Sequence, residues 1–276
     1  DRPSAGWVEY GPDETLGLRA VPALDGLVEA GTTVHRVTLD GLDPDRVYHY
    51  RIATRPIETY GPYKVDFGNI VRSDPATFRT LGPARSHYAF LVLNDLHEDL
   101  DTWKRHAGRA AAEPYDLVFL NGDSLSHLEN ERQILERCLR PASEWFADRV
   151  PFLLVRGNHE TRGQYARQLK NYLGLPDGRY FYSFDHGPVH FLVMDTGEDK
   201  EDGHWAYSGL TGFDAYRQAQ ADWLASEIRS AAFRQAAFRV LVAHMPFFGN
   251  QGTRVTGHGQ QDAAKRWGAM LDAAGL

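Results

Sequence analysis

The feature that most limits the fold of this chain is a set of five short, almost continuous apolar runs after residue 86. In order, they are HYAFLVLNDLH, YDLVFLNGD, VPFLLVRGNHE, VHFLVMDTG and FRVLVAHMP. Stretches of helical length and amphipathic composition lie between them, at residues 99–113, 130–148, 161–174 and 216–233. Strands that are apolar along their whole length are covered on both faces of their sheet. We therefore expect a layered α/β domain, with β-sheets flanked by helices, over residues 84–276.

Residues 1–83 have a different pattern, because short β segments follow one another between turns and no helix of useful length is present. The stretch from Leu42 to Arg51 has Leu, Pro and two Tyr residues at the spacing of a tyrosine corner, and it resembles the corresponding stretch of fibronectin type III-like domains. Such domains have about seven strands in roughly 90 to 100 residues. We expect a small all-β fibronectin III-like sandwich without its first one or two strands, joined to the α/β domain by the linker 80–86.

Four of the five apolar runs end in residues that can bind metals, N-D-L-H, N-G-D, G-N-H-E and A-H-M-P, and the remaining run ends at Asp195. The carboxyl ends of neighbouring strands in an α/β sheet share one edge, where ligands bind. This edge is expected to bring together six side chains: Asp95, His97, Asp123, Asn158, His159 and His244. Each of them alone has an ordinary explanation as a turn, a cap or a hydrogen-bonded structural residue. Their joint occurrence at successive strand ends favours a metal site.

The donor types restrict the choice of metal. Carboxylate, imidazole and amide oxygen without thiolate suit Mn, Fe, Zn or Co and argue against a structural zinc knot. Several donors imply two ions, and one carboxylate can bridge ions that lie about 3.5 to 4 Å apart. Asp123 is the predicted bridge, because Gly122 before it lets the backbone approach closely. The histidines at positions 127, 186, 190 and 204 lack such a context and are expected to be structural.

Charge and composition argue against several classes of partner. The formal net charge of -7 gives no nucleic-acid-binding signature. No run of about 18 apolar residues is present, so no membrane span is predicted. The single cysteine, Cys138, excludes an internal disulfide and is expected to be a buried structural thiol. The oligomeric state is left open.

Together, D-L-H at 95–97, G-D at 122–123, G-N-H-E at 157–160 and V-A-H-M-P at 242–246 resemble the ordered motifs of calcineurin-like metallophosphoesterases. The resemblance extends from about residue 87 to residue 276, and the combination of motifs is highly specific. A fibronectin-like domain in front of such a domain is similar to the layout of purple acid phosphatases and their bacterial relatives. This layout implies a secreted, periplasmic or cell-envelope location, while the chain begins without a signal-peptide pattern.

The resemblance implies five ligands for two divalent or trivalent metal ions: Asp95 and His97 for the first, Asn158 and His244 for the second, and Asp123 for both. It implies that His159 binds no metal and lies against the phosphoryl group of the substrate, as general acid or transition-state stabiliser. Glu160 is expected to orient His159, since carboxylates fix the tautomer of imidazoles.

The chain departs from the family pattern in two respects. Purple acid phosphatases have Gly at the position of His97 and Tyr at the position of Ser126, so the colour of a tyrosinate on ferric iron is not expected here. The family's final G-H-x-H motif does not follow the A-H-M-P strand, and residues 263–276 resemble the helix and lead-in that come before it. We expect either that the chain is a fragment or that another group completes the site. His258 is expected in a surface loop.

These observations predict a metal-dependent hydrolase of phosphate esters that uses a dinuclear centre and metal-bound hydroxide. Its substrate would be a phosphomonoester or phosphodiester, either a small molecule or a larger phosphorylated substrate. Arg156 or Arg162 would contact the phosphate, with exposed solubilising arginines as the other reading. Residues 197–214 are expected to form a rim where substrate specificity lies. The alternative is a non-catalytic metal-binding or adhesive module with an incomplete site.

Overall fold

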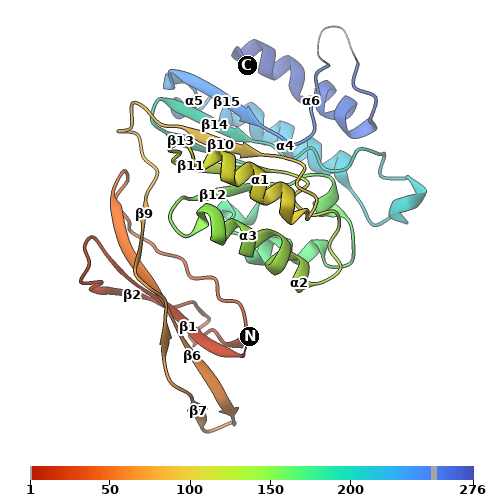
Figure 1. Cartoon of the computed structure of the whole chain (residues 1–276). Helices are drawn as coiled ribbons and strands as arrows, with labels where there is room; N and C mark the ends of the chain where they lie inside the picture. Colours follow the sequence, from red (N-terminus) through yellow and green to blue (C-terminus); the bar gives the residue numbers. More distant parts are fainter. Residues whose placement is uncertain (1, 250–253) are drawn as a thin grey trace. The chain divides into compact units, whose positions relative to one another are not determined.

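The computed structural model describes residues 2–249 and 254–276. The chain forms two compact units, one from the residues up to Leu81 with 148–151 and the other from 82–147 with 152–276 (Figure 1). An antiparallel β region precedes an α/β domain, so the predicted fold class is confirmed. The predicted domain limits, 1–83 and 84–276, stay a prediction.

The N-terminal unit is built on one long antiparallel pair, β1 (Ser4–Gly11) and β6 (Val47–Tyr60). Two strands pair with β1 and three with β6, in a seven-stranded sheet: β2 (Leu18–Ala20) and β5 (Ala30–Thr32), then β7 (Val65–Phe67), β8 (Val71–Arg72) and β9 (Ala76–Arg79). A separate hairpin is formed by β3 (Ala23–Leu24) and β4 (Leu27–Val28). The Asp43 N–H donates to the hydroxyl of the buried Tyr48 (3.0 Å), as expected for a tyrosine corner.

A partly buried polar cluster around Glu9 joins three strands of this sheet. The Glu9 carboxylate, whose side chain is 15% exposed, accepts from the Trp7 indole (3.1 Å), from Arg51 and from Arg72 (3.4 Å). The bond from Trp7 and those from the two arginines outweigh the opposing effect of burial and lower the pKa of Glu9 to about 2. Glu9 is therefore ionised at neutral pH.

The second unit contains two three-stranded sheets. The first is parallel: β10 (Phe90–Leu93), β11 (Leu117–Asn121) and β12 (Phe152–Val155). The second joins an antiparallel pair to a parallel one: β13 (Tyr182–His186), β14 (Val189–Val193) and β15 (Phe238–Val242). The Phe191 ring of β14 lies 5.6 Å from the rings of Phe90 and Phe119, so phenyl groups pack the sheets together. All five predicted strands are confirmed, and β13, which polar residues interrupt, is additional.

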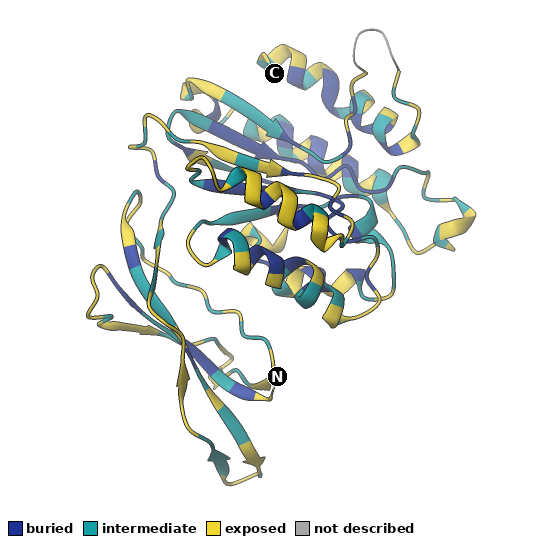
Figure 2. Ribbon diagram, viewed as in Figure 1, coloured by how far each residue is buried: buried dark blue, intermediate teal, exposed yellow. Residues whose placement is uncertain are grey.

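Helices cover the outer faces of these sheets. Figure 1 shows α1 (Leu100–Ala110) and α6 (His258–Ala274) on opposite sides of the strands. Trp103 of α1 stacks on Phe146, with ring centres 6.3 Å apart. On the other side, α4 (Phe213–Glu227), α5 (Ala231–Gln235) and α6 bury a second cluster against β14: Leu192, Met194, Ala221, Leu224, Phe233, Phe247, Ala263, Trp267 and Leu271. Figure 2 shows the buried residues concentrated in the strands and along one side of each long helix.

The helix predicted at 130–148 is present but irregular. In it, α2 (Glu131–Ile134) and α3 (Arg140–Ala142) alternate with π-helical turns at Leu135–Leu139 and Ser143–Ala147. Pro141 lies inside this segment and has no N–H to donate to a preceding turn.

The prediction of a helix at 161–174 is wrong, because this segment has only 3-10 turns, at His159–Thr161 and Ala166–Tyr172. Its backbone bonds to Leu128 instead: the Tyr165 N–H donates to the Leu128 carbonyl (2.8 Å), and the Arg162 carbonyl accepts from the Leu128 N–H (2.9 Å). Gly163, with a φ of +90°, allows this pairing, since a Cβ there would overlap the Leu128 carbonyl.

Glu9→Gln is expected to destabilise the N-terminal unit by about 1 to 3 kcal/mol at neutral pH, because bonds to a charged group are weakened. The folded pKa of about 2 lies below the ordinary value of 4.5, so the stabilisation is complete above pH 4.5 and is lost as the pH falls towards 2. Urea denaturation across this range should show the wild-type advantage shrinking with falling pH. Glu58→Gln, at a carboxylate that is 53% exposed, is the matched control and should change little. A wild-type advantage that does not vary with pH would contradict the prediction.

Candidate metal centre

The candidate site is formed by the loops that follow β10, β11, β12 and β15. Backbone bonds join the first two loops, since the Asp95 N–H donates to the Gly122 carbonyl (3.2 Å) and the His97 N–H to the Asp123 carbonyl (2.8 Å). Four non-glycine residues here have φ between +46° and +64°: Asp95, His97, Glu98 and Asp123. Such backbone strain is costly and is concentrated at functional sites.

Asp123 lies at the centre of the site. Its Oδ2 atom is 3.2 Å from His244 Nε2, 3.8 Å from His97 Nε2 and 3.9 Å from His159 Nε2. His97 Nε2 is also 3.7 Å from Asp95 Oδ1. Two groups of three side chains could hold a metal ion: His97, Asp123 and His159, and Asp95, Asp123 and His244. Asp123 belongs to both groups, which is the position that a bridging carboxylate needs.

These two groups pair the predicted ligands differently from the assignment to two metal ions made from the sequence. Asp95 is grouped with His244, and His97 with His159, which was predicted to bind no metal. Asn158 precedes His159 on the same loop and would offer an amide oxygen, a donor type that these groups of His and Asp do not include. The assignment of each residue to a particular ion therefore stays a prediction.

Two glycines permit the close approach of the donors. Gly122 has a φ of +82°, and a Cβ there would overlap the His244 ring. A Cβ on Gly157 would overlap the Asp123 carboxylate and lie 2.8 Å from Glu160 Oε2. Carboxylates and imidazoles that converge without thiolates fit the metals expected from the sequence.

The electrostatics of the site couple Asp123 to His244. Burial disfavours the charged form of Asp123, but the His244 imidazole and the His159 N–H stabilise it and lower its pKa. Burial likewise disfavours the charged form of His244, while Asp123 and the Asn121 carbonyl stabilise it and raise its pKa to about 8. An incoming metal ion must therefore displace the proton on His244, since only the neutral imidazole is a ligand.

Asparagine side chains and carbonyls behind the donors orient them. His244 Nδ1 donates to the Asn121 carbonyl (2.8 Å), so that Nε2 faces Asp123. The Asn121 amide donates to Asn94 Oδ1 (2.9 Å), and the Asn94 amide donates to the Asp95 carboxylate. The sequence analysis assigned no role to either asparagine. Their positions at the ends of apolar runs, as the first residues of the N-D and N-G-D motifs, were the available signal.

The prediction that Glu160 orients His159 is wrong. The Glu160 carboxylate is fully buried and accepts three backbone N–H groups, those of Asp123 (2.8 Å), Leu125 (3.0 Å) and Gly157 (2.9 Å). Burial raises the pKa of this carboxyl, although the three N–H groups favour its charged form. Glu160 thus joins the loop after β11 to the loop after β12 and fixes the position of Asp123.

His159 is oriented by other groups. Its Nδ1 donates to the Ser126 carbonyl (2.7 Å), and its Nε2 accepts from Arg162 Nη1 (2.9 Å). Arg162 is held in turn by two N–H bonds to the buried Glu198 carboxylate (2.8 and 3.0 Å). This role of Glu198 was not predicted from the sequence, because Glu198 lies in a loop without a motif. Arg162, 31% exposed, therefore lies at the edge of the site.

Other predicted residues lie outside both groups. Arg156 is only 16% exposed and pairs with Asp195 (2.6 Å), so the alternative of an exposed solubilising arginine is wrong for Arg156. His258 is exposed at the surface, as expected, but it is the first residue of α6 and pairs with Asp214 (2.9 Å), so its placement in a loop is wrong. Cys138 is buried as predicted, and burial raises the pKa of its thiol to about 12.

Across residues 2–249 and 254–276, no helix is both long and apolar enough for a membrane span.

Comparison with known proteins adds a family match and two similar folds. The sequence model of the family described as calcineurin-like phosphoesterase matches residues 88–271, well over half of the chain. A purple acid phosphatase isolated from yellow lupin (Lupinus luteus) seeds is 18% identical, with a TM-score of 0.63 over 96% of this chain and 51% of that one. The structure of PhoD is also 18% identical, with a TM-score of 0.59 over 100% of this chain and 63% of that one. A search of curated protein sequences found no match to this chain.

These two structures are similar in fold, and at 18% identity the likeness shows the fold alone. The chain spans about half the length of the lupin structure and less than two thirds of PhoD.

Gly157→Ala is expected to destabilise the protein by about 1 to 3 kcal/mol, because the new Cβ must displace the Asp123 or Glu160 carboxylate. It should also lower the metal content of the purified protein. Gly174→Ala is the matched control, since a Cβ there meets nothing within 4 Å, and it should change stability by less than about 0.5 kcal/mol. Thermal denaturation and elemental analysis measure both effects. Equal stability and metal content in the two variants would contradict the role given to Gly157.

Proposed function

This chain belongs to the calcineurin-like phosphoesterase family, and we propose on that basis that it is a metal-dependent hydrolase of phosphate esters. The observation that most strongly supports this function is the position of Asp123, whose carboxylate is shared by two groups of His and Asp side chains. A shared carboxylate is what a two-metal hydrolytic centre requires. The positive φ of Asp95 and of His97 gives further support, since strain of this kind persists where the surrounding structure maintains it for function.

The proposed cofactor is a pair of metal ions, from among Mn, Fe, Zn and Co, held by five residues: Asp95, His97, Asp123, Asn158 and His244. When bound, such ions neutralise the charge of the phosphate and lower the pKa of a coordinated water. Asp123, whose pKa lies below its ordinary value, is ionised at neutral pH, as a metal-ligating carboxylate must be. The buried Glu160 holds this carboxylate in place through the Asp123 N–H (2.8 Å).

His159 is proposed to act at the leaving group, as general acid or transition-state stabiliser. A neutral His159 that donates from Nδ1 to the Ser126 carbonyl presents an unprotonated Nε2, and this atom accepts from Arg162. Once Nε2 is protonated it no longer accepts, and the Arg162 N–H is then free to donate to a phosphoryl oxygen. His159 and Arg162 would thus act together on one phosphoryl group.

The substrate is proposed to be a phosphomonoester or phosphodiester. A secreted, periplasmic or cell-envelope location is proposed from the order of the chain, in which an antiparallel β region precedes the phosphoesterase domain. Fractionation of the native cells with an antibody to the protein tests the location, and recovery in the cytoplasmic fraction alone would exclude it.

Turnover of para-nitrophenyl phosphate or bis(para-nitrophenyl) phosphate is expected to vanish when a chelator removes the metal and to return when Mn, Zn or Fe is added. Asp123→Asn should abolish this turnover and lower the bound metal, because the carboxylate shared by both groups loses one anionic oxygen. Asp272→Asn, at an exposed position on α6, is the matched control and should retain both. The absence of metal-dependent turnover with either ester, or an Asp123→Asn variant with unchanged metal and rate, would contradict the proposal.

His159→Ala is expected to keep its metal content while kcat falls by about 10²- to 10⁴-fold, the usual contribution of a positioned proton donor. The exposed His106→Ala on α1 is the matched control and should keep both values. Loss of one metal ion from His159→Ala would instead assign His159 as a ligand, in agreement with its grouping beside His97 and Asp123.

A further inference from the structure

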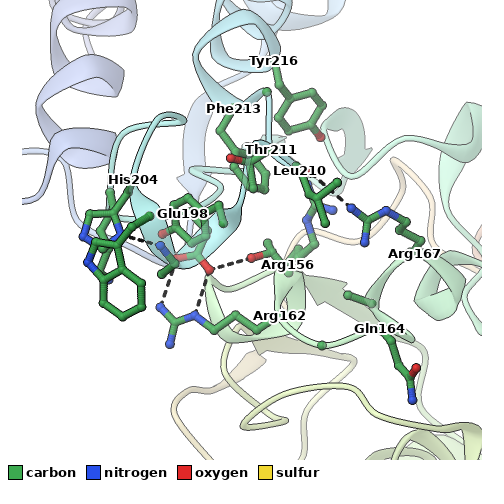
Figure 3. Close-up of a pocket in the computed structure, with 18 residues that line it drawn as sticks. Arg156, Arg162, Gln164, Arg167, Glu198, His204, Leu210, Thr211, Phe213 and Tyr216 are labelled. Carbon is green, nitrogen blue, oxygen red and sulfur yellow. Dashed lines mark hydrogen bonds and ion pairs between the residues drawn. The ribbon is translucent and has the colours of Figure 1, made fainter.

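A cavity of about 880 Å³ lies beside the candidate metal centre, lined by residues of the segments 156–167 and 198–216 (Figure 3). We call this cavity the side pocket. Its volume lies in the range of small-molecule binding sites, about 300 to 1,000 Å³. We propose that the side pocket binds the organic group of the phosphate ester, and that this group has an aromatic ring and a second anionic substituent. The inference rests on the proposed function, in which the phosphoryl group itself binds at the metal centre.

Arg162 connects the side pocket to the centre. It lines the pocket, and its Nη1 donates to His159 Nε2 (2.9 Å). The Glu198 carboxylate, 1% exposed, accepts two N–H groups of Arg162, as Figure 3 shows, and the Thr161 hydroxyl (2.9 Å). The guanidinium is therefore fixed between pocket and centre. An ester whose phosphoryl group lies against His159 has its organic group within reach of the pocket.

Two large apolar side chains of the pocket are unusually exposed. Trp205 is 84% exposed and Leu210 is 70% exposed. The His204 ring lies 5.4 Å from the Trp205 ring, and His204 Nδ1 accepts the Ala206 N–H (3.3 Å), which fixes the turn that presents the indole. A planar ring of a ligand would stack on an indole in this position and cover it. The structural role predicted for His204 thus includes a place in the pocket wall.

Arg167 supplies the positive charge. Its Nη2 donates to the Leu210 carbonyl (3.2 Å), and within residues 2–249 and 254–276 no carboxylate lies at ion-pair distance from it. Lys200, by contrast, pairs with Asp199 (2.7 Å), and the other arginines of the pocket have carboxylate partners. In the view of Figure 3, Arg167 lies on the opposite side of the pocket from His204. An anionic substituent beyond the stacked ring would meet Arg167.

Three non-hydrolysable ligands separate these contributions: methylphosphonate, benzylphosphonate and para-carboxybenzylphosphonate. Calorimetric titration of the Mn-loaded protein is expected to give about tenfold tighter binding for the second ligand than for the first, the contribution of a stacked ring. The carboxylate should tighten binding a further threefold or so, the contribution of a solvent-exposed ion pair. Inhibition of para-nitrophenyl phosphate turnover should follow the same order.

Trp205→Ala should remove the advantage of the ring and keep that of the carboxylate, while Arg167→Gln should do the reverse. Tyr63→Ala and Arg132→Gln, at an exposed aromatic residue and an exposed arginine outside the pocket, are the matched controls and should keep both. Equal dissociation constants for the three ligands, or Trp205→Ala and Arg167→Gln variants that keep both advantages, would overturn the proposal.

The two proposals fail in different ways. Metal-dependent turnover without any advantage of the ring leaves the proposed function standing and excludes the side pocket as the binding site of the organic group. An advantage of the ring that depends on Trp205, in a protein without metal-dependent turnover, supports the side pocket as a ligand site and excludes the proposed hydrolase.

Discussion

The buried carboxylate of Glu160 is the interaction on which the rest of the site depends. A carboxylate can accept several N–H groups at once, and this one accepts three from two loops that are distant in sequence. Burying the charge is costly unless such bonds replace its hydration. The same bonds hold the strained turn at Asp123 against the loop after β12. This fully buried group thus fixes two of the four loops that present the candidate metal donors, those after β11 and β12.

Much of the fold and the convergence of the candidate donors could be predicted because their signals are local. An apolar run indicates by its own composition that the segment is buried, and strands are present at all five expected positions. A polar residue directly after such a run must lie at the end of a strand, which is why Asp95, Asp123 and His244 could be expected to lie close together. The role of Gly122 was also readable, since a glycine before a candidate ligand suggests a close approach.

The remaining features depend on contacts between distant segments, which a single sequence does not reveal. The segment 161–174 has helical composition, but Gly163 lets its backbone bond to Leu128 instead. Glu160 was expected to contact the adjacent imidazole, yet its partners are N–H groups of the loop after β11 and of Gly157. His258 is fixed by Asp214, 44 residues earlier in the chain. In each case the observed structure depends on a hydrogen bond to a distant segment, which the neighbouring sequence does not indicate.

The two hydrogen bonds from Arg162 to Glu198 also have a consequence for redesign. Segment 198–216 offers many side chains to a ligand, and exchanging it for the equivalent loop of a relative would be the obvious way to change selectivity. Glu198 at its start, however, is the group that aims Arg162 at His159. A transplanted loop without an acid at this position would release the guanidinium and so disturb its contact with His159. Loop grafts in this chain should therefore begin after Glu198, so that a new surface is joined to an unaltered contact between Arg162 and His159.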